Sequence, residues 1–169
     1  MKTVDIIHNW NAELVRRLRE EEIIEKVDWI EDKPLNIFCH IYSGKEYWYF
    51  ACGEPDIYEE YIVPKDLSLH EACAVVKFEE YNETLRSLPS KCEAEYHMCL
   101  DECSGDHDCI VQCREEYNEC MSKIDLATRR LDIEGKKLER YGLQILERLA
   151  GEDAGSPDVD EIIRVEKLL

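Results

Sequence analysis

Residues 92–120 read CEAEYHMCLDECSGDHDCIVQCREEYNEC, and this stretch decides how the C-terminal half of the chain folds. Its six cysteines are spaced C-x6-C-x3-C-x5-C-x3-C-x6-C, a palindrome centred on Asp106. At about 100° per residue of helix, the three cysteines before the centre fall on one stripe, and so do the three after it. If the chain reverses at residues 104–107, the two stripes face each other in an antiparallel helical hairpin.

This geometry selects one of the many pairings that six cysteines allow. The mirrored partners are Cys92 with Cys120, Cys99 with Cys113, and Cys103 with Cys109. Three nested disulfides are the favoured prediction, and we call these six residues the cysteine ladder. Each bridge is expected to stabilise the fold by about 2–4 kcal/mol, although nested bridges do not add fully.

A metal site is an alternative interpretation of the same residues. Two i, i+4 pairs supply four thiolates that could hold zinc or an iron–sulfur cluster: Cys99, Cys103, Cys109 and Cys113. The outer pair of the ladder fits this alternative poorly, because it continues the ladder without joining the four. A redox-active dithiol is a weaker alternative, since the sequence has no C-x-x-C motif. The favoured interpretation needs no cofactor.

The ladder resembles two known kinds of disulfide-bonded helical hairpin. Cys99-x3-Cys103 and Cys109-x3-Cys113 are similar to the twin C-x3-C motif of small chaperones of the mitochondrial intermembrane space. The hairpin also resembles the α-hairpinin peptides. The resemblance covers about 30 of the 169 residues, the gap between the two motifs is shorter than in the chaperones, and the third rung is additional. It therefore implies a stapled hairpin far more than it implies chaperone or antimicrobial activity.

Helix signals extend outward from the ladder on its N-terminal side. A capping box, Ser68-Leu-His-Glu71, predicts the start of a helix that runs to about Ser87. Pro89 is expected to break or kink this helix. A second capping box, Ser90-Lys-Cys-Glu93, predicts that a new helix starts there.

On the C-terminal side of the ladder, Asp106 is well suited to cap the next helix, which could run unbroken to Ala150. Residues 151–158 are predicted to form a flexible linker. Residues 159–169 are predicted to form an amphipathic tail helix.

The N-terminal residues 1–66 predict a helix followed by a small antiparallel sheet. Thr3 could cap a helix whose apolar stripe is Ile7, Trp10, Leu14 and Leu18. Strands are expected over residues 23–30, 35–42, 46–52 and 61–63. With Gly44-Lys45 as a two-residue turn, Cys39 faces Phe50 and lies diagonally from Cys52, a loose fit for a fourth bridge. The expected fold class is α+β, ending in a stapled hairpin and a long C-terminal helix.

Several apolar side chains are candidates for an interaction surface. One set on the long predicted helix recurs every seven residues: Ile110, Tyr117, Ile124, Leu131, Leu138 and Ile145. It either packs against the helix over 68–88 or forms an intermolecular coiled coil. A second set lies elsewhere around the helix and favours a homodimer: Leu126, Ile133, Leu143 and Leu146. The aromatic hairpin could also line a ligand groove or form an interaction surface, although core or dimer packing is the favoured interpretation: Tyr42, Tyr47, Trp48, Tyr49 and Phe50.

Composition narrows the kinds of molecule and the cellular setting that we expect for this protein. The chain of 169 residues carries 39 acidic and 21 basic side chains, a formal net charge of −18. That charge disfavours direct binding to a nucleic-acid backbone. No apolar run approaches the ~20 residues of a membrane helix. The first residues lack an uninterrupted apolar region, so no ordinary signal peptide is expected.

Nine cysteines are many for a protein of a reducing cytosol. Intracellular disulfides are common in hyperthermophilic archaea, and a composition poor in Gln and rich in Glu paired with Lys and Arg agrees with such a source. We therefore expect a protein of a hyperthermophilic archaeon or of its virus, acting in the cytoplasm of the cell or the infected host. A virion protein, or one exported by an unconventional route, is the alternative.

No catalytic motif was found, and none of the five histidines stands in a recognisable metal-ligand pattern: His8, His40, His70, His97 and His107. The favoured function is a non-enzymatic structural or interaction protein, homodimeric and stabilised by disulfides. One alternative is an acidic mimic of nucleic acid that inhibits a basic DNA-binding protein of the host. The other is a thiolate metal-binding or redox protein.

Overall fold

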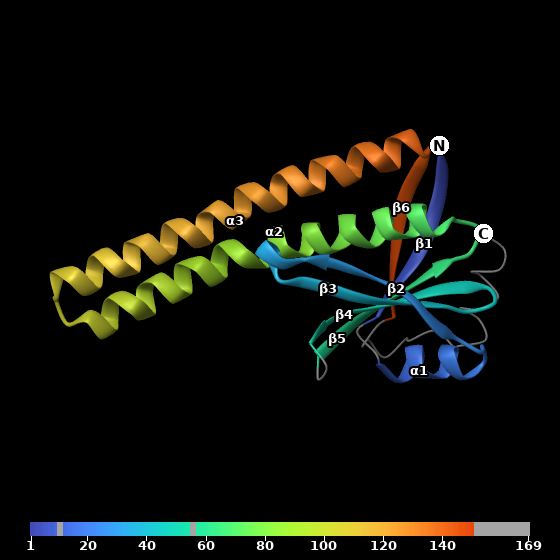
Figure 1. Ribbon diagram of the computed structural model, residues 1–169, viewed down its shortest axis with the longest axis horizontal. Coiled ribbons are helices and arrows are strands. Elements are labelled where there is room, and N and C mark those ends of the chain that lie inside the picture. The colour runs from blue at the N-terminus through green and yellow to red at the C-terminus, as the bar shows by residue number, and fades with distance from the viewer. Residues whose placement is uncertain (10–11, 55–56, 151–169) are drawn as a thin grey trace. The chain divides into compact units, whose positions relative to one another are not determined.

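The computed structural model describes residues 1–9, 12–54 and 57–150 (Figure 1). Over these residues the protein has a mixed α+β fold with a six-stranded sheet, two long helices and four disulfides. The chain divides into two compact units. Among the described residues, one comprises Met1–Val76 and residues 136–150, and the other is Lys77–Gly135.

The sheet of the first unit has the strand order β2-β3-β4-β5-β1-β6. Its strands are β1 (Lys2–Asn9), β2 (Glu25–Asp32), β3 (Ile37–Ser43), β4 (Tyr47–Glu54), β5 (Ile57–Pro64) and β6 (Leu143–Ala150). The order from β2 to β5 is a meander of antiparallel neighbours, close to the strands that the sequence predicts. A short helix, α1 (Ala12–Glu20), follows β1, and a 3-10 turn, Lys33–Leu35, joins β2 to β3.

Strand β1 corrects the predicted N-terminal helix, which was expected to start near Thr3. It is an inner strand, antiparallel to β5 and parallel to β6, and Val4, Ile6 and Ile7 are each at most 3 % exposed. A short run rich in β-branched residues suits a strand that is covered on both faces. The stripe predicted for one helix in fact combined residues of β1 with residues of α1. Its member Trp10 lies outside the described residues.

Strand β6 corrects the prediction that the long helix continues to Ala150. Helix α3 (His107–Arg140) is followed by a turn at Gly142, whose φ of 68° lies in the left-handed region and whose N–H donates to the Glu139 carbonyl at 3.0 Å. Glycine adopts this conformation without a Cβ penalty, so it commonly ends helices. The chain then pairs in parallel with β1, from Lys2 opposite Leu143 to the strand's last residue. The predicted linker and tail helix lie outside the described residues.

Helix α2 (Leu69–Cys103) is continuous, so of the break or kink predicted at Pro89 the break is wrong, and so is the helix start predicted at Ser90. Pro89 lies inside the helix and on its exposed side. Proline removes one backbone hydrogen bond there, and the helix continues through that loss. No helix in the described part of the chain is both long enough and apolar enough to span a membrane.

The two capping boxes offer a matched test of where α2 begins. The Ser68 hydroxyl accepts the Glu71 N–H at 3.2 Å, and the Glu71 carboxylate accepts the Ser68 N–H at 2.9 Å. Ser68→Ala is therefore expected to lower the free energy of unfolding by about 1 kcal/mol. Ser90→Ala is expected to change it by less than about 0.5 kcal/mol, because Ser90 lies exposed within the helix. Urea titration followed by circular dichroism measures both, and an equal loss in the two variants would contradict this assignment.

The hairpin of β3 and β4 turns one residue later than predicted. The Gly44 N–H donates to the Tyr47 carbonyl at 2.9 Å, which leaves Lys45 and Glu46 as the turn. The Glu22 carboxylate accepts the Glu46 N–H at 2.9 Å and occupies the space that a Cβ on Gly44 would need. A carboxylate from another segment thus holds the turn in this register.

The corrected register brings two cysteines directly opposite each other. Cys39 pairs with Cys52 rather than with Phe50, and their Cα atoms are 4.0 Å apart. The two residues form a disulfide, and both are buried. Cys73 is the one cysteine outside the four bridges.

Candidate functional site

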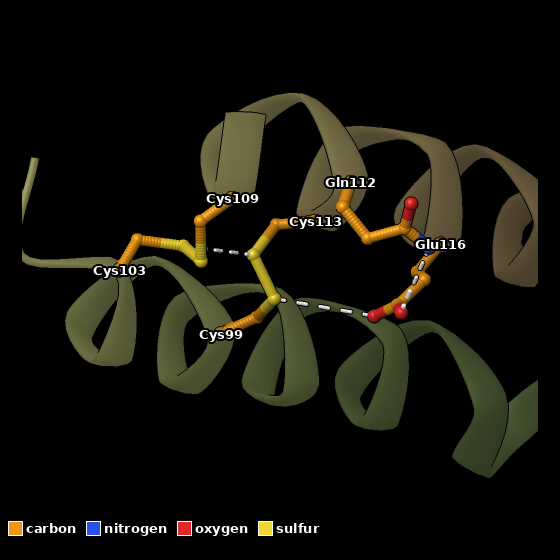
Figure 2. The surroundings of a disulfide bond; sticks show 6 residues. All are labelled: Cys99, Cys103, Cys109, Gln112, Cys113 and Glu116. Atoms are coloured by element: carbon orange, nitrogen blue, oxygen red, sulfur yellow. Dashed lines mark hydrogen bonds between the residues drawn. A yellow bond between two sulfur atoms is a disulfide. The ribbon is translucent and has the colours of Figure 1, made fainter. Parts of the chain in front are cut away.

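The cysteine ladder joins α2 to α3 in the pairs that the palindromic spacing predicts. The bridges are Cys92–Cys120, Cys99–Cys113 and Cys103–Cys109, with Cα separations of 5.8, 5.7 and 5.4 Å. Such nested pairing requires the two helices to run antiparallel. Figure 2 shows the two inner bridges lying between the helices, one helical turn apart. We call residues 92–120 the acidic hairpin, because they include nine acidic side chains.

A tight turn lies at the centre of the palindrome, where the sequence predicts it. Ser104 and Gly105 both have positive φ, 51° and 83°. The Asp106 N–H donates to the Cys103 carbonyl, and the Ile110 N–H donates to the Asp106 carbonyl, each at 3.0 Å. Asp106 thus stands just before α3, at the cap position that the sequence predicts. The turn fixes the register in which the stripes of cysteines meet.

Sulfur forms the core of the acidic hairpin. Among its residues only Cys92, Cys103 and Cys113 are buried, and their exposed fractions are 1, 5 and 1 %. The aromatic pair Tyr96 and Tyr117 is half-buried, with ring centroids 4.7 Å apart. Packed apolar side chains normally supply the stability of a helical pair. Here the disulfides take over that role, because apolar burial is so small.

The charged side chains on the outer surface of this hairpin are almost all negative. Nine carboxylates are exposed, and Arg114 is the only Lys or Arg within residues 92–120. The nine are Glu93, Glu95, Asp101, Glu102, Asp106, Asp108, Glu115, Glu116 and Glu119. Like charges on one small body repel each other and oppose the compact state. Covalent links between the helices allow such a surface to persist.

The two inner bridges lie in direct contact. The Sγ atoms of Cys103 and Cys113, which belong to different bridges, are 3.4 Å apart. On the other side of the ladder, Cys99 Sγ lies 3.9 Å from a carboxylate oxygen of Glu116, and Gln112 donates to the other oxygen at 3.3 Å (Figure 2). The sulfurs thus form one continuous cluster beside a carboxylate.

The bonded state of the ladder bears on the metal alternative. The sulfurs of Cys99, Cys103 and Cys113 lie within 4.8 Å of one another, a spacing at which three thiolates could share an ion. Each of these sulfurs, and that of Cys109, is held in a disulfide. A metal site needs the thiolate form. The oxidised hairpin therefore offers no thiolate among these four residues.

The apolar residues predicted as an interaction face do not form a single helical face. Three of them, Leu143, Ile145 and Leu146, belong to β6 instead of α3. On α3, Leu138 is buried, and Ile133 is 48 % exposed. The remaining predicted residues are half-buried: Ile110, Tyr117, Ile124, Leu126 and Leu131. A Cβ on Gly135 would lie 3.5 Å from the Phe78 ring, so this helix approaches α2 of the same chain closely.

The aromatic hairpin contributes mainly to the core. Tyr47 and Tyr49 are 5 and 1 % exposed, and they pack in one cluster with Ile7, Leu18 and Ile62. Trp48 is half-buried, and its indole N–H donates to the Leu67 carbonyl at 3.0 Å. This burial agrees with core packing, one of the two packing arrangements that the sequence favours for both tyrosines.

A pocket of about 410 Å³ lies beside these tyrosines, which belong to the aromatic cluster that could line a ligand groove. Its walls combine apolar and acidic side chains: Leu18, Glu21, Glu22, Ile23, Lys45, Glu46, Tyr47 and Tyr49. The Tyr49 hydroxyl donates to the Glu22 carboxylate at 2.9 Å. Burial, and then this carboxylate, raise the pKa of Tyr49 well above its usual value of 10. Nothing in the linear sequence joins Glu22 to the hairpin, so pattern reasoning could not place this carboxylate in the wall of the pocket.

The comparisons with known proteins give no further guide. No family model, no curated protein and no solved structure matches this chain. The site must therefore be interpreted from its own geometry.

Proposed function

We propose that the protein is a non-enzymatic interaction protein, and that the acidic hairpin binds a basic surface of a partner protein. The observation that carries this proposal is the combination of a sulfur core with an outer surface of nine exposed carboxylates. Helices that need no apolar stripe can present charge all round. A rigid charged surface loses little conformational entropy on binding, and its field speeds association with an oppositely charged partner.

Imitation of nucleic acid is a narrower form of the same proposal. Under it, the partner is a DNA- or RNA-binding protein whose basic cleft receives the acidic hairpin in place of phosphates. The two forms differ in one outcome, which is whether nucleic acid competes with this protein for the partner. Neither form requires the homodimer that the sequence favours, because the hairpin is built from one chain.

Two variants of equal charge test the proposal. One replaces Glu93, Glu95, Glu102 and Glu115 by Gln, and the other replaces Glu20, Glu21, Glu25 and Glu31 by Gln. All eight side chains are exposed, and each variant changes the net charge from −18 to −14. The probe is an oligolysine peptide, with binding measured by calorimetry at several salt concentrations. We expect the hairpin variant to bind about tenfold or more weakly than wild type, since each exposed charge pair contributes about 0.2–1 kcal/mol.

The second variant is expected to bind within about threefold of wild type, and salt is expected to weaken binding in all three proteins. An equal loss of affinity in both variants would show that binding follows net charge alone. That result would overturn the hairpin as the binding surface.

A further inference from the structure

We propose that the two inner bridges act as a thiol–disulfide relay, in which a thiolate at Cys103 attacks Cys113 and releases Cys99. The inference concerns the ladder alone and does not depend on the proposed partner. It starts from the 3.4 Å separation between the Sγ atoms of Cys103 and Cys113, which is contact distance for two sulfurs of different bridges. Thiol–disulfide exchange requires such contact between the attacking sulfur and the disulfide.

Within the turn bridge Cys103–Cys109, exposure decides which sulfur a reductant reaches. In the turn bridge, Cys109 is half-buried, whereas Cys103 is only 5 % exposed. A small dithiol reductant therefore attacks Cys109 Sγ, which forms a mixed disulfide there and expels Cys103 as a thiolate. The second thiol of the reductant then releases Cys109 as a thiol, and the reductant leaves as its own disulfide.

The relay step moves the bond by one helical turn. The Cys103 thiolate attacks Cys113 Sγ, so that a Cys103–Cys113 bond forms and the Cys99–Cys113 bond breaks. The electron pair of the broken bond leaves with the Cys99 sulfur, which takes up a proton from solvent. The net result is one reduced bridge, whose two thiols are Cys99 and Cys109 instead of Cys103 and Cys109. The reactive thiol is thereby delivered to Cys99, 3.9 Å from the Glu116 carboxylate.

A matched pair of single variants tests the relay without added reductant. In Cys109→Ser the Cys103 thiol remains beside the Cys99–Cys113 bridge. In Cys103→Ser that attacking sulfur is gone, and the remaining thiol is Cys109. Each protein is held at mildly alkaline pH, quenched with acid, denatured, alkylated and mapped by proteolysis and mass spectrometry. Cys73, outside the bridges, serves as the reference for complete labelling.

For Cys109→Ser we add the alkylation found on Cys99 to that found on Cys103, and we expect at least a tenth of this sum on Cys99. A peptide cross-linked between Cys103 and Cys113 should also be present. For Cys103→Ser we expect label on Cys109 and at least tenfold less on Cys99. Label on Cys103 alone in Cys109→Ser would overturn the relay.

Wild type provides a second measurement should either variant fail to fold. It is treated with less than one equivalent of dithiothreitol and then mapped in the same way. The relay predicts Cys99 and Cys109 as the first labelled pair of the ladder. Labelling of Cys103 and Cys109, with the Cys99–Cys113 bridge intact, would overturn it.

Discussion

Complete reduction of the cysteine ladder is expected to unfold the helices of the acidic hairpin while the sheet stays folded. The hairpin buries only cysteine side chains, so removal of its three bridges removes its core. Each bridge contributes about 2–4 kcal/mol, and repulsion among nine carboxylates then acts on a pair of unlinked helices. We expect amide hydrogen exchange within residues 92–120 to accelerate about a hundredfold or more, which corresponds to a loss of about 3 kcal/mol.

A double variant, Cys39→Ser with Cys52→Ser, separates this effect from loss of the fourth bridge. It removes the disulfide of the sheet and keeps the ladder, so exchange in the hairpin should match that of oxidised wild type. Added salt should partly restore protection in the reduced hairpin, because it screens the carboxylates. Unchanged protection of residues 92–120 after full reduction would show that the disulfides are not the core of the hairpin.

The second large effect is expected from Ile6→Ala in β1. Ile6 is fully buried, in a strand that pairs with β5 on one side and β6 on the other. Removal of its outer carbons leaves a cavity within a sheet that cannot readily collapse, and such changes cost about 2–5 kcal/mol. Chemical denaturation followed by tyrosine and tryptophan fluorescence measures the loss.

Ile23→Ala is the matched control, because the same side chain at that position is 96 % exposed. It should change the free energy of unfolding by less than about 0.5 kcal/mol. If Ile6→Ala were as mild as its control, β1 would not be an inner strand of the sheet. The predicted N-terminal helix would then regain support.

The ladder was predictable because its information is local and periodic. The helical period places each triplet of cysteines on one stripe, and the turn at Gly105 lies midway between them. The meander from β2 to β5 was predictable for a similar reason, since neighbouring strands follow each other along the chain. Ser68 and Glu71 show the same locality, because a capping box is complete within four residues.

The rest depends on contacts between distant parts of the chain. Strand β6 forms beside β1, which lies more than a hundred residues earlier in the chain. By spacing alone, the apolar residues of β6 fit the seven-residue repeat of a helix as well as they fit a strand. The hairpin turn is placed by Glu22, which no local rule connects to Gly44. The local signal at Pro89 predicts a break or a kink, yet α2 continues without a break, with Pro89 on its exposed side. In each case a long-range partner or the position around the helix outweighed the local signal.

The most direct test of the central claim is disulfide mapping of the protein purified without reductant. Intact mass before and after reduction, followed by peptide mapping of the unreduced chain, identifies every bridge. The structure predicts a deficit of eight hydrogen atoms, with cross-links Cys92–Cys120, Cys99–Cys113, Cys103–Cys109 and Cys39–Cys52, and alkylation at Cys73. Six alkylated thiols between residues 92 and 120, or a different pairing among them, would contradict the sulfur core on which the account of the acidic hairpin rests.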